Sequence, residues 1–313
     1  MTYAQFIGRR LLHVIPVVFG VTFVVFWLIH LVPGDPARTA LGFKATPEAI
    51  ANLHQEWGLD KSLPEQYVNY LGRLVQGDLG TSFRFQDSAG SLIIERLPVT
   101  LWLLAYSAVL ICLIAGPLAL LAASKPGAMR DKLVRVFSIA GLGIPGFWLG
   151  LILIQYVAIE ASLLPAAGYG EGFTGHLESM FLPSLTIAVG VIPLVVRSLR
   201  AEVLKVADSE FVVTARAKGL SERRIRLRHV LRNALPPSVT ILAINMGFLV
   251  GGTVVIERVY GLGGVGELML TAINSRDFPV VQAVTLFFAL LVIAINFFGD
   301  LIQALLDPRL EIQ

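Results

Sequence analysis

The sequence predicts an all-α membrane protein, a polytopic helical bundle with six transmembrane helices. Only 15% of the 313 residues are charged and 55% are apolar, whereas a soluble globular domain carries about 25% charged residues. In addition, six stretches lack Asp, Glu, Lys and Arg over most or all of the ~20 residues that a helix needs to cross about 30 Å of hydrocarbon. Lipid is therefore the expected surroundings of most of the chain.

The six uncharged stretches follow one another along the whole chain. A charge at mid-span costs about 2.5–3.5 kcal/mol on insertion scales, so six such gaps are not expected by chance. The fourth stretch is the shortest. The predicted spans are Leu11–Gly34, Leu97–Ser124, Val136–Ile159, Ser179–Val196, Ala234–Ile256 and Phe278–Gly299. They divide the chain into an N-terminal tail with the first span (1–34), an extracytoplasmic subdomain (35–96), a core of five spans (97–303) and a C-terminal tail (304–313).

The distribution of Lys and Arg predicts the orientation. An even number of spans puts both termini on one side, and that side also holds the basic segments 125–135 and 197–232. Most cations of the other side lie in the long segment 35–96, and long segments count little in the positive-inside rule. Both termini are therefore expected in the cytoplasm. Arg9-Arg10 could also begin a secretory signal, but the apolar run after it exceeds a signal core of about 7–15 residues, so a retained span is expected.

The segment 35–96 is too long to be a simple connection. Helical periodicity over Glu48–Trp57 and Leu63–Val75, interrupted by Gly58 and Gly77, predicts a small exterior subdomain. Two roles remain open for it: packing on the first span, or docking of a partner.

The segment from Arg197 to Arg232 contains ten Lys or Arg and four Asp or Glu. Asp208, Ser209 and Glu210 are typical of a helix start, because they favour its free N–H groups. A short helix is predicted from there to Lys218, with Gly219 in the left-handed conformation just after its end. A second helix, from Glu222 to Leu235, is predicted to run towards the fifth span within a connecting loop 197–235.

This basic segment has three possible interpretations. It could enforce topology or rest on anionic membrane lipid. Nucleic-acid binding is disfavoured, because no aromatic residues alternate with the basic ones to stack on bases. The favoured interpretation is a rigid docking element for a cytoplasmic partner, since Phe211 is an aromatic anchor on a short exposed helix.

Motifs for catalysis or cofactor binding are missing from the sequence. It contains no G-x-x-x-x-G-K-[ST], H-E-x-x-H, C-x-x-C or G-x-S-x-G pattern. Its five histidines are scattered, and the single cysteine, Cys112, lies in an apolar run. No catalytic residue, metal site or cofactor is therefore predicted in this chain.

A few polar residues fall inside or at the ends of the predicted spans. Gln155, Asn245 and Glu257 are candidates to line a pathway, because intramembrane polar residues usually face the bundle interior. Hydrogen bonds between helices are the alternative for Gln155 and Asn245. No series of ionisable groups lies at depth, which disfavours a carrier driven by an ion gradient.

Several motifs, in order over the whole chain, carry a family resemblance. The sequence resembles the permease subunits of bacterial ABC importers for dipeptides, oligopeptides, glutathione and nickel chelates. The motifs are His30–Ala37, Gly77–Gly80, Pro98–Leu101, Thr214–Leu220, Arg228–Leu235 and Asp307–Arg309. Of the general importer pattern E-A-A-x3-G-x9-I-x-L-P, only Ala215, Gly219 and Leu231 fit.

The resemblance implies the type I ABC importer permease fold in the bacterial cytoplasmic membrane. It also implies the partners: a second homologous permease subunit, two cytoplasmic ATP-binding subunits and an extracytoplasmic solute-binding protein. The chain itself would hydrolyse no ATP and would form half of a pathway for di- or oligopeptides, with glutathione or nickel chelates as alternatives. The residues expected to couple it to the ATPase are Glu210, Phe211, Thr214, Ala215, Lys218 and Gly219.

Overall fold

The computed structural model describes residues 3–31, 35–42 and 45–306. Within these ranges the fold is an all-helical membrane bundle, and the one extended pairing is an isolated bridge between Thr81 and Ser88. The chain forms two compact units. One consists mainly of Leu101–Leu262, and the other mainly of Ile7–Thr100 with Gly263–Leu290.

The helices of the second unit are short, apart from the first. This unit contains α1 (Tyr3–Leu31), α2 (Pro36–Leu41), α3 (Pro47–Trp57), α4 (Leu63–Val75) and α12 (Val265–Asn274). Three helices contribute residues to both units: α1, whose residues 3–6 belong to the first unit, and the long helices α5 (Ala89–Ala123) and α13 (Phe278–Leu306).

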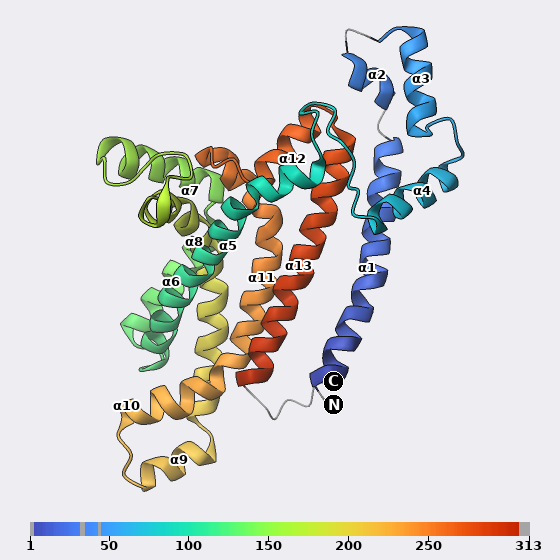
Figure 1. The fold of residues 1–313 in the computed structure, drawn as a ribbon. Helices are drawn as coiled ribbons and strands as arrows, with labels where there is room; N and C mark the ends of the chain where they lie inside the picture. Colours follow the sequence, from blue (N-terminus) through green and yellow to red (C-terminus); the bar gives the residue numbers. More distant parts are fainter. Residues whose placement is uncertain (1–2, 32–34, 43–44, 307–313) are drawn as a thin grey trace. The chain divides into compact units, whose positions relative to one another are not determined.

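The first unit holds most of the long apolar helices (Figure 1). Its elements are α6 (Met129–Gly143), α7 (Gly146–Leu153), the π-helical segment η2 (Ile154–Glu160), α8 (Gly172–Ala207), α9 (Glu210–Ala217), α10 (Glu222–Arg224), the π-helical segment η3 (Ile225–Val230) and α11 (Leu231–Tyr260).

The described residues account for four or five of the six predicted spans. Among the described residues, four helices are long and apolar enough to cross a membrane: α5, α8, the continuous helix Glu222–Tyr260, and α13. A fifth is added if the pair α6 and α7–η2 counts as one span. In α1 the apolar part among the described residues, Val14–Trp27, is shorter than a span. The end of the first predicted span, residues 32–34, lies outside the described residues.

The third predicted span is not a straight helix. Its two halves, Met129–Gly143 and Gly146–Glu160, meet at an angle of 100°. Ile144 at the break is extended, with φ −88° and ψ 118°. Pro145 explains the break, because proline has no N–H to continue the helix and pushes the residue before it out of the helical region.

The predicted helices of the segment 35–96 are confirmed. The helices α3 and α4 end where expected, and Gly58 (φ 67°) and Gly77 (φ 80°) take the left-handed backbone that glycine allows. Helix α2 was not predicted; the Asp35 side chain accepts a hydrogen bond from the Ala37 amide at its start. The second span begins at Ala89 rather than Leu97.

Helix α4 packs on α1 through aromatic side chains. Tyr67, Tyr70 and Phe26 form a buried cluster. The Tyr67 hydroxyl and the Thr22 hydroxyl are hydrogen-bonded at 3.1 Å, and the rings of Phe19 and Phe23 meet Tyr67 edge-on. The packing role that the sequence left open for this segment is therefore present.

Helix α8 is the centre of the first unit, where it contacts α6, α7 and α11. It was predicted as the shortest span, yet it has 36 residues and continues through Pro183 and Pro193. Gly141 of α6 lies against Pro193 and the Val189 carbonyl, where an added Cβ would come within 3.3 Å of both. Proline cannot donate to the carbonyl four residues earlier, and the close neighbouring helix explains why the break is tolerated.

Candidate functional site

The short helix α9 is the predicted docking element, and it lies beyond the end of α8 (Figure 1). One face is closed, because Val212 and Ala215 are buried and α9 contacts η3, whose Ile225 and Val230 are also buried. The other face is open: Phe211 is 46% exposed and Val213 58%. Glu210, Thr214 and Lys218 are exposed as well. The helix is therefore packed against η3 on one face and exposes the aromatic side chain of Phe211 on the other.

The end of α9 is set by a glycine. Gly219 has φ +77°, its amide donates to the Arg216 carbonyl at 2.9 Å, and the Leu220 amide donates to the Ala215 carbonyl at 3.3 Å. These are the bonds of a left-handed helix stop. An added Cβ would meet nothing within 4 Å, so the backbone angle, not space, selects glycine here. The helix itself stops at Ala217, one residue before the predicted end.

The start of α9 differs from the expected side-chain cap. Ser209 has the extended backbone of a capping residue, but its hydroxyl makes no bond to the first amides of α9. It donates instead to the Val206 carbonyl at 2.6 Å. That carbonyl lies in the last turn of α8, where no later residue of the helix supplies an amide to bond it. The Ser209 side chain therefore closes α8, while its own carbonyl accepts from the Val212 amide.

An ion pair connects α9 to α10. The Arg216 guanidinium donates to the Glu222 carboxylate at 2.8 Å. Both side chains are about half exposed, and such pairs contribute at most about 1 kcal/mol. The pair orients the turn between the two helices more than it stabilises the chain. Nothing in the sequence pattern indicated it.

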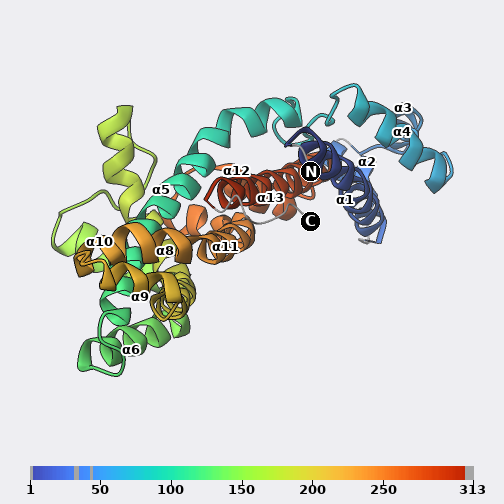
Figure 2. The same ribbon diagram turned by 90° about the horizontal axis from the view of Figure 1, so that it is seen from below.

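The second helix of the basic segment runs directly into the fifth predicted span. It begins at Glu222, passes through η3 and continues as α11 without interruption to Tyr260, 39 residues in all. The predicted end at Leu235 is wrong, because Pro236 and Pro237 are accommodated inside α11. Single π-turns inside α-helices are frequent at functional sites. Figure 2 shows α9 and α10 from below, next to α8.

A buried ion pair joins α8 to α6. The Asp131 side chain is fully buried and accepts from Arg200 at 2.7 Å (Nε) and 2.9 Å (Nη2). It also accepts from the Gly127 amide at 2.8 Å, and Arg135 lies at 3.5 Å. The two partners are 69 residues apart in sequence, so sequence inspection could not find the pair. Arg200 lies two turns before the end of α8, close to where α9 is attached.

A second connection lies towards the other end of α8. The buried Tyr260 hydroxyl is hydrogen-bonded to Thr186 of α8 at 2.9 Å and donates to the Gly150 carbonyl of α7 at 3.4 Å. At about 1.5 Å per residue, Thr186 and Arg200 are about 21 Å apart along α8. Side-chain contacts thus join α8 to α6 at one level of the bundle, and to α7 and α11 at another.

The three pathway candidates have different surroundings in the structure. Gln155 is exposed on η2 and bonds Glu160 at 3.1 Å. The Asn245 amide donates to the Ile241 carbonyl of its own helix. Glu257 is buried, twelve residues further along α11, which is about 18 Å away. Over the described part of the chain, no group of three His, Cys, Asp or Glu could hold a metal ion.

Two family models match this sequence. Residues 115–312 match "Binding-protein-dependent transport system inner membrane component", and residues 3–104 match the N-terminal model of such membrane components. The chain belongs to this family. It is a polytopic inner-membrane permease subunit of ABC importers, not an enzyme, and ATP hydrolysis is left to partner ATPase subunits.

Curated relatives cover the whole chain. The glutathione transport system permease protein GsiC of Escherichia coli K12 is 36% identical over 307 residues, which is 98% of this chain and 99% of the relative. The protein of the same name from Pectobacterium atrosepticum is 36% identical over 303 residues, 97% of each chain. A chain from structures of the MetNI methionine ABC transporter in inward-facing conformations matches with a TM-score of 0.57 and 21% identity, covering 69% of this chain and 96% of that one. The last match shows the fold alone.

Proposed function

We propose that this permease forms half of the translocation pathway of an ATP-driven importer for small peptides, and that α9 is its coupling helix. The observation that carries the proposal is the exposed Phe211 on a helix whose other face is closed against η3. Exposed aromatic side chains on a supported element are typical anchors of protein interfaces. The second half of the pathway would come from a homologous permease subunit, and the solute from an extracytoplasmic binding protein.

The proposed orientation puts α9 in the cytoplasm, with both chain termini. The basic segments 125–135 and 197–232 support it, because short basic segments stay on the cytoplasmic side. The segment 35–96 would then be an exterior subdomain. Each of two ATP-binding subunits would bind the coupling helix of one permease.

The connections around α9 support a mechanism of alternating access. The helix is attached to α8 at one end and, through α10 and η3, to α11 at the other. Any displacement of α9 by an ATPase therefore acts on two spans at once. The Asp131–Arg200 pair would carry the same displacement to α6. Rocking of packed helices between two arrangements is a common form of such transitions.

Crosslinking tests the docking role. A Phe211→Cys variant of the complex in membranes should form a crosslink to an ATPase subunit, and nucleotide should change its yield. Phe173→Cys, exposed in the first turn of α8, is the matched control and should form none. Crosslinks of Phe211→Cys only to lipid or to the chain itself would contradict the docking role.

The solute is a separate part of the proposal. The motifs of the sequence favour di- or oligopeptides, and the likeness to permeases named for glutathione makes that tripeptide the second candidate. Gln155, Asn245 and Glu257 remain the proposed lining residues. Uptake of a labelled dipeptide by cells carrying the complete importer, with glutathione and a nickel chelate as competitors, separates the candidates. Uptake that follows the ion gradient rather than ATP would instead favour a secondary carrier.

A further inference from the structure

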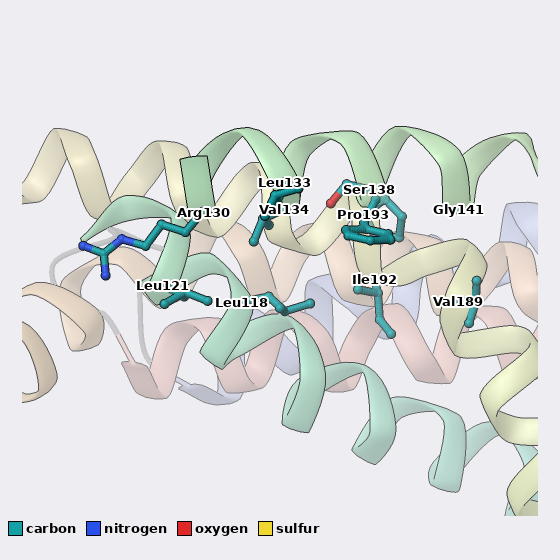
Figure 3. Close-up of a pocket in the computed structure, with 11 residues that line it drawn as sticks. Leu118, Leu121, Arg130, Leu133, Val134, Ser138, Gly141, Val189, Ile192 and Pro193 are labelled. Atoms are coloured by element: carbon teal, nitrogen blue, oxygen red, sulfur yellow. The ribbon is translucent and has the colours of Figure 1, made fainter. Parts of the chain in front are cut away.

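An apolar groove lies between α5, α6 and α8 (Figure 3). Its volume is about 380 Å³, within the range of about 300–1,000 Å³ that ligand pockets have. Apart from Arg130 and Ser138, the side chains that line it are apolar. The lining residues are Leu118 and Leu121 of α5, Arg130, Leu133, Val134, Phe137, Ser138 and Gly141 of α6, and Val189, Ile192 and Pro193 of α8.

The groove follows one face of α6. The six lining positions of α6 recur three or four residues apart, which is the spacing of a single helix face. From Arg130 to Gly141 the face is about 16 Å long. Half of a hydrocarbon core of about 30 Å is about 15 Å. The groove is thus no deeper than one leaflet with its headgroup layer.

A cation stands at one end of this groove. Figure 3 shows Arg130 at one end of the row of side chains and Gly141 with Val189 at the other. In the described part of the chain no ion pair joins the Arg130 guanidinium to a carboxylate, and the neighbouring Asp131 forms ion pairs with Arg200 and Arg135 and accepts from the Gly127 amide. Arg130 precedes the uncharged stretch that starts at Val136 by six residues, which is about 9 Å of helix. The headgroup region is about 5–8 Å deep on each side of the hydrocarbon, so this distance puts Arg130 at its outer edge.

We propose that this groove binds one anionic phospholipid, with an acyl chain along α6 and the phosphate at Arg130. Three of the lining side chains, Leu121, Leu133 and Phe137, are exposed, so another molecule must contact them in the membrane. An acyl chain matches the apolar wall, and an anionic headgroup matches the Arg130 guanidinium. The site lies beside the Asp131–Arg200 pair, so the lipid holds α5, α6 and α8 together next to the end of α8 that carries α9. This inference rests on membrane insertion and not on the proposed solute or coupling role.

Photolabelling of the reconstituted importer complex tests the site. The probes are phosphatidylglycerol and phosphatidylcholine, each with a diazirine on the acyl chain, and labelled residues are mapped by mass spectrometry. Phosphatidylglycerol should label the groove residues roughly fivefold more than phosphatidylcholine, the effect of about one cation near an anionic headgroup. Arg130→Gln should abolish that preference. Lys132→Gln, on the same helix but outside the groove, should keep most of it.

A second pair of variants tests the acyl chain. Leu121→Trp fills the groove from α5 and should reduce labelling by both probes at least threefold, whereas Leu113→Trp, on an exposed part of α5 outside the groove, should not. Equal labelling by the two probes, or equal effects of Arg130→Gln and Lys132→Gln, would overturn the proposal. So would crosslinks from a photoreactive amino acid at Phe137 to the second permease subunit, because a protein would then cover the groove.

Discussion

Helices α4 and α9 are both short and both carry aromatic side chains, yet they use them in opposite ways. Helix α4 buries Tyr67 and Tyr70 against α1, and the Tyr67 hydroxyl is hydrogen-bonded there. Helix α9 buries only Val212 and Ala215 and leaves Phe211 exposed. The aromatic surface of α4 is thus satisfied within the chain, whereas that of α9 is left for a partner. Substitutions in α4 should therefore mainly lower the stability of the fold, whereas substitutions in α9 should mainly lower transport.

The largest loss of stability is expected at Tyr67. Removing a buried aromatic side chain costs about 3–5 kcal/mol, so Tyr67→Ala should detach α4 from α1. Limited proteolysis of membranes should then cut between residues 47 and 75. Tyr67→Phe keeps the ring and loses only the hydrogen bonds of the hydroxyl, with Thr22 and with the Phe19 carbonyl, and it should be cut far more slowly. Equal protection of both variants and the parent protein would show that α4 is held by other contacts.

The next largest effect is expected at Asp131. A hydrogen bond to a charged group contributes about 1.5–3 kcal/mol. Asp131→Asn should therefore lower the thermal stability of the purified complex and weaken the contact between α6 and the end of α8 that carries α9. The ratio of ATP hydrolysed to solute transported should rise. Arg135→Gln is the control, because this exposed partner contributes at most about 1 kcal/mol. If both variants change the ratio equally, the buried pair has no special part in coupling.

A smaller loss of stability, with a large loss of transport, is expected at Gly219. A side chain at φ +77° costs about 1–2 kcal/mol, and Gly219→Val should change where α9 ends. The complex should still assemble and hydrolyse ATP, while uptake falls to background. Gly77→Val is a matched control, since Gly77 has φ +80° and equally open surroundings but lies far from α9 in the chain. Normal uptake by Gly219→Val would refute the docking role of α9.

The smallest effect on stability is expected at Phe211. An exposed side chain can be removed within about 0.5 kcal/mol, so Phe211→Ala should leave the melting temperature of the chain unchanged. An interface anchor, in contrast, contributes about 2 kcal/mol or more, so copurification of the ATPase should fall about 30-fold. Phe173→Ala is the matched control and should affect neither measurement. Unchanged ATPase binding by Phe211→Ala would show that Phe211 is not an anchor for the ATPase.

Local signals in the sequence predicted the short helices well. Helices α3, α4 and α9 lie within a residue or two of their expected positions, because the left-handed glycines Gly58, Gly77 and Gly219 act over a single turn. Span boundaries were less accurate. The extended start of α5, the length of α8 and the bend at Pro145 depend on what packs against each helix, and the hydropathy of a segment does not contain that information.

The sequence by itself determined that this chain is a helical membrane permease, and it located α9 and its stop at Gly219. Absence of charge over long stretches and turn chemistry at single residues are properties of the chain alone. Only the tertiary structure decided which aromatic side chains are buried, that Asp131 pairs with Arg200, and that Glu257 is buried whereas Gln155 is exposed. Those outcomes depend on contacts between residues far apart in sequence, which the folding of the helices on one another creates.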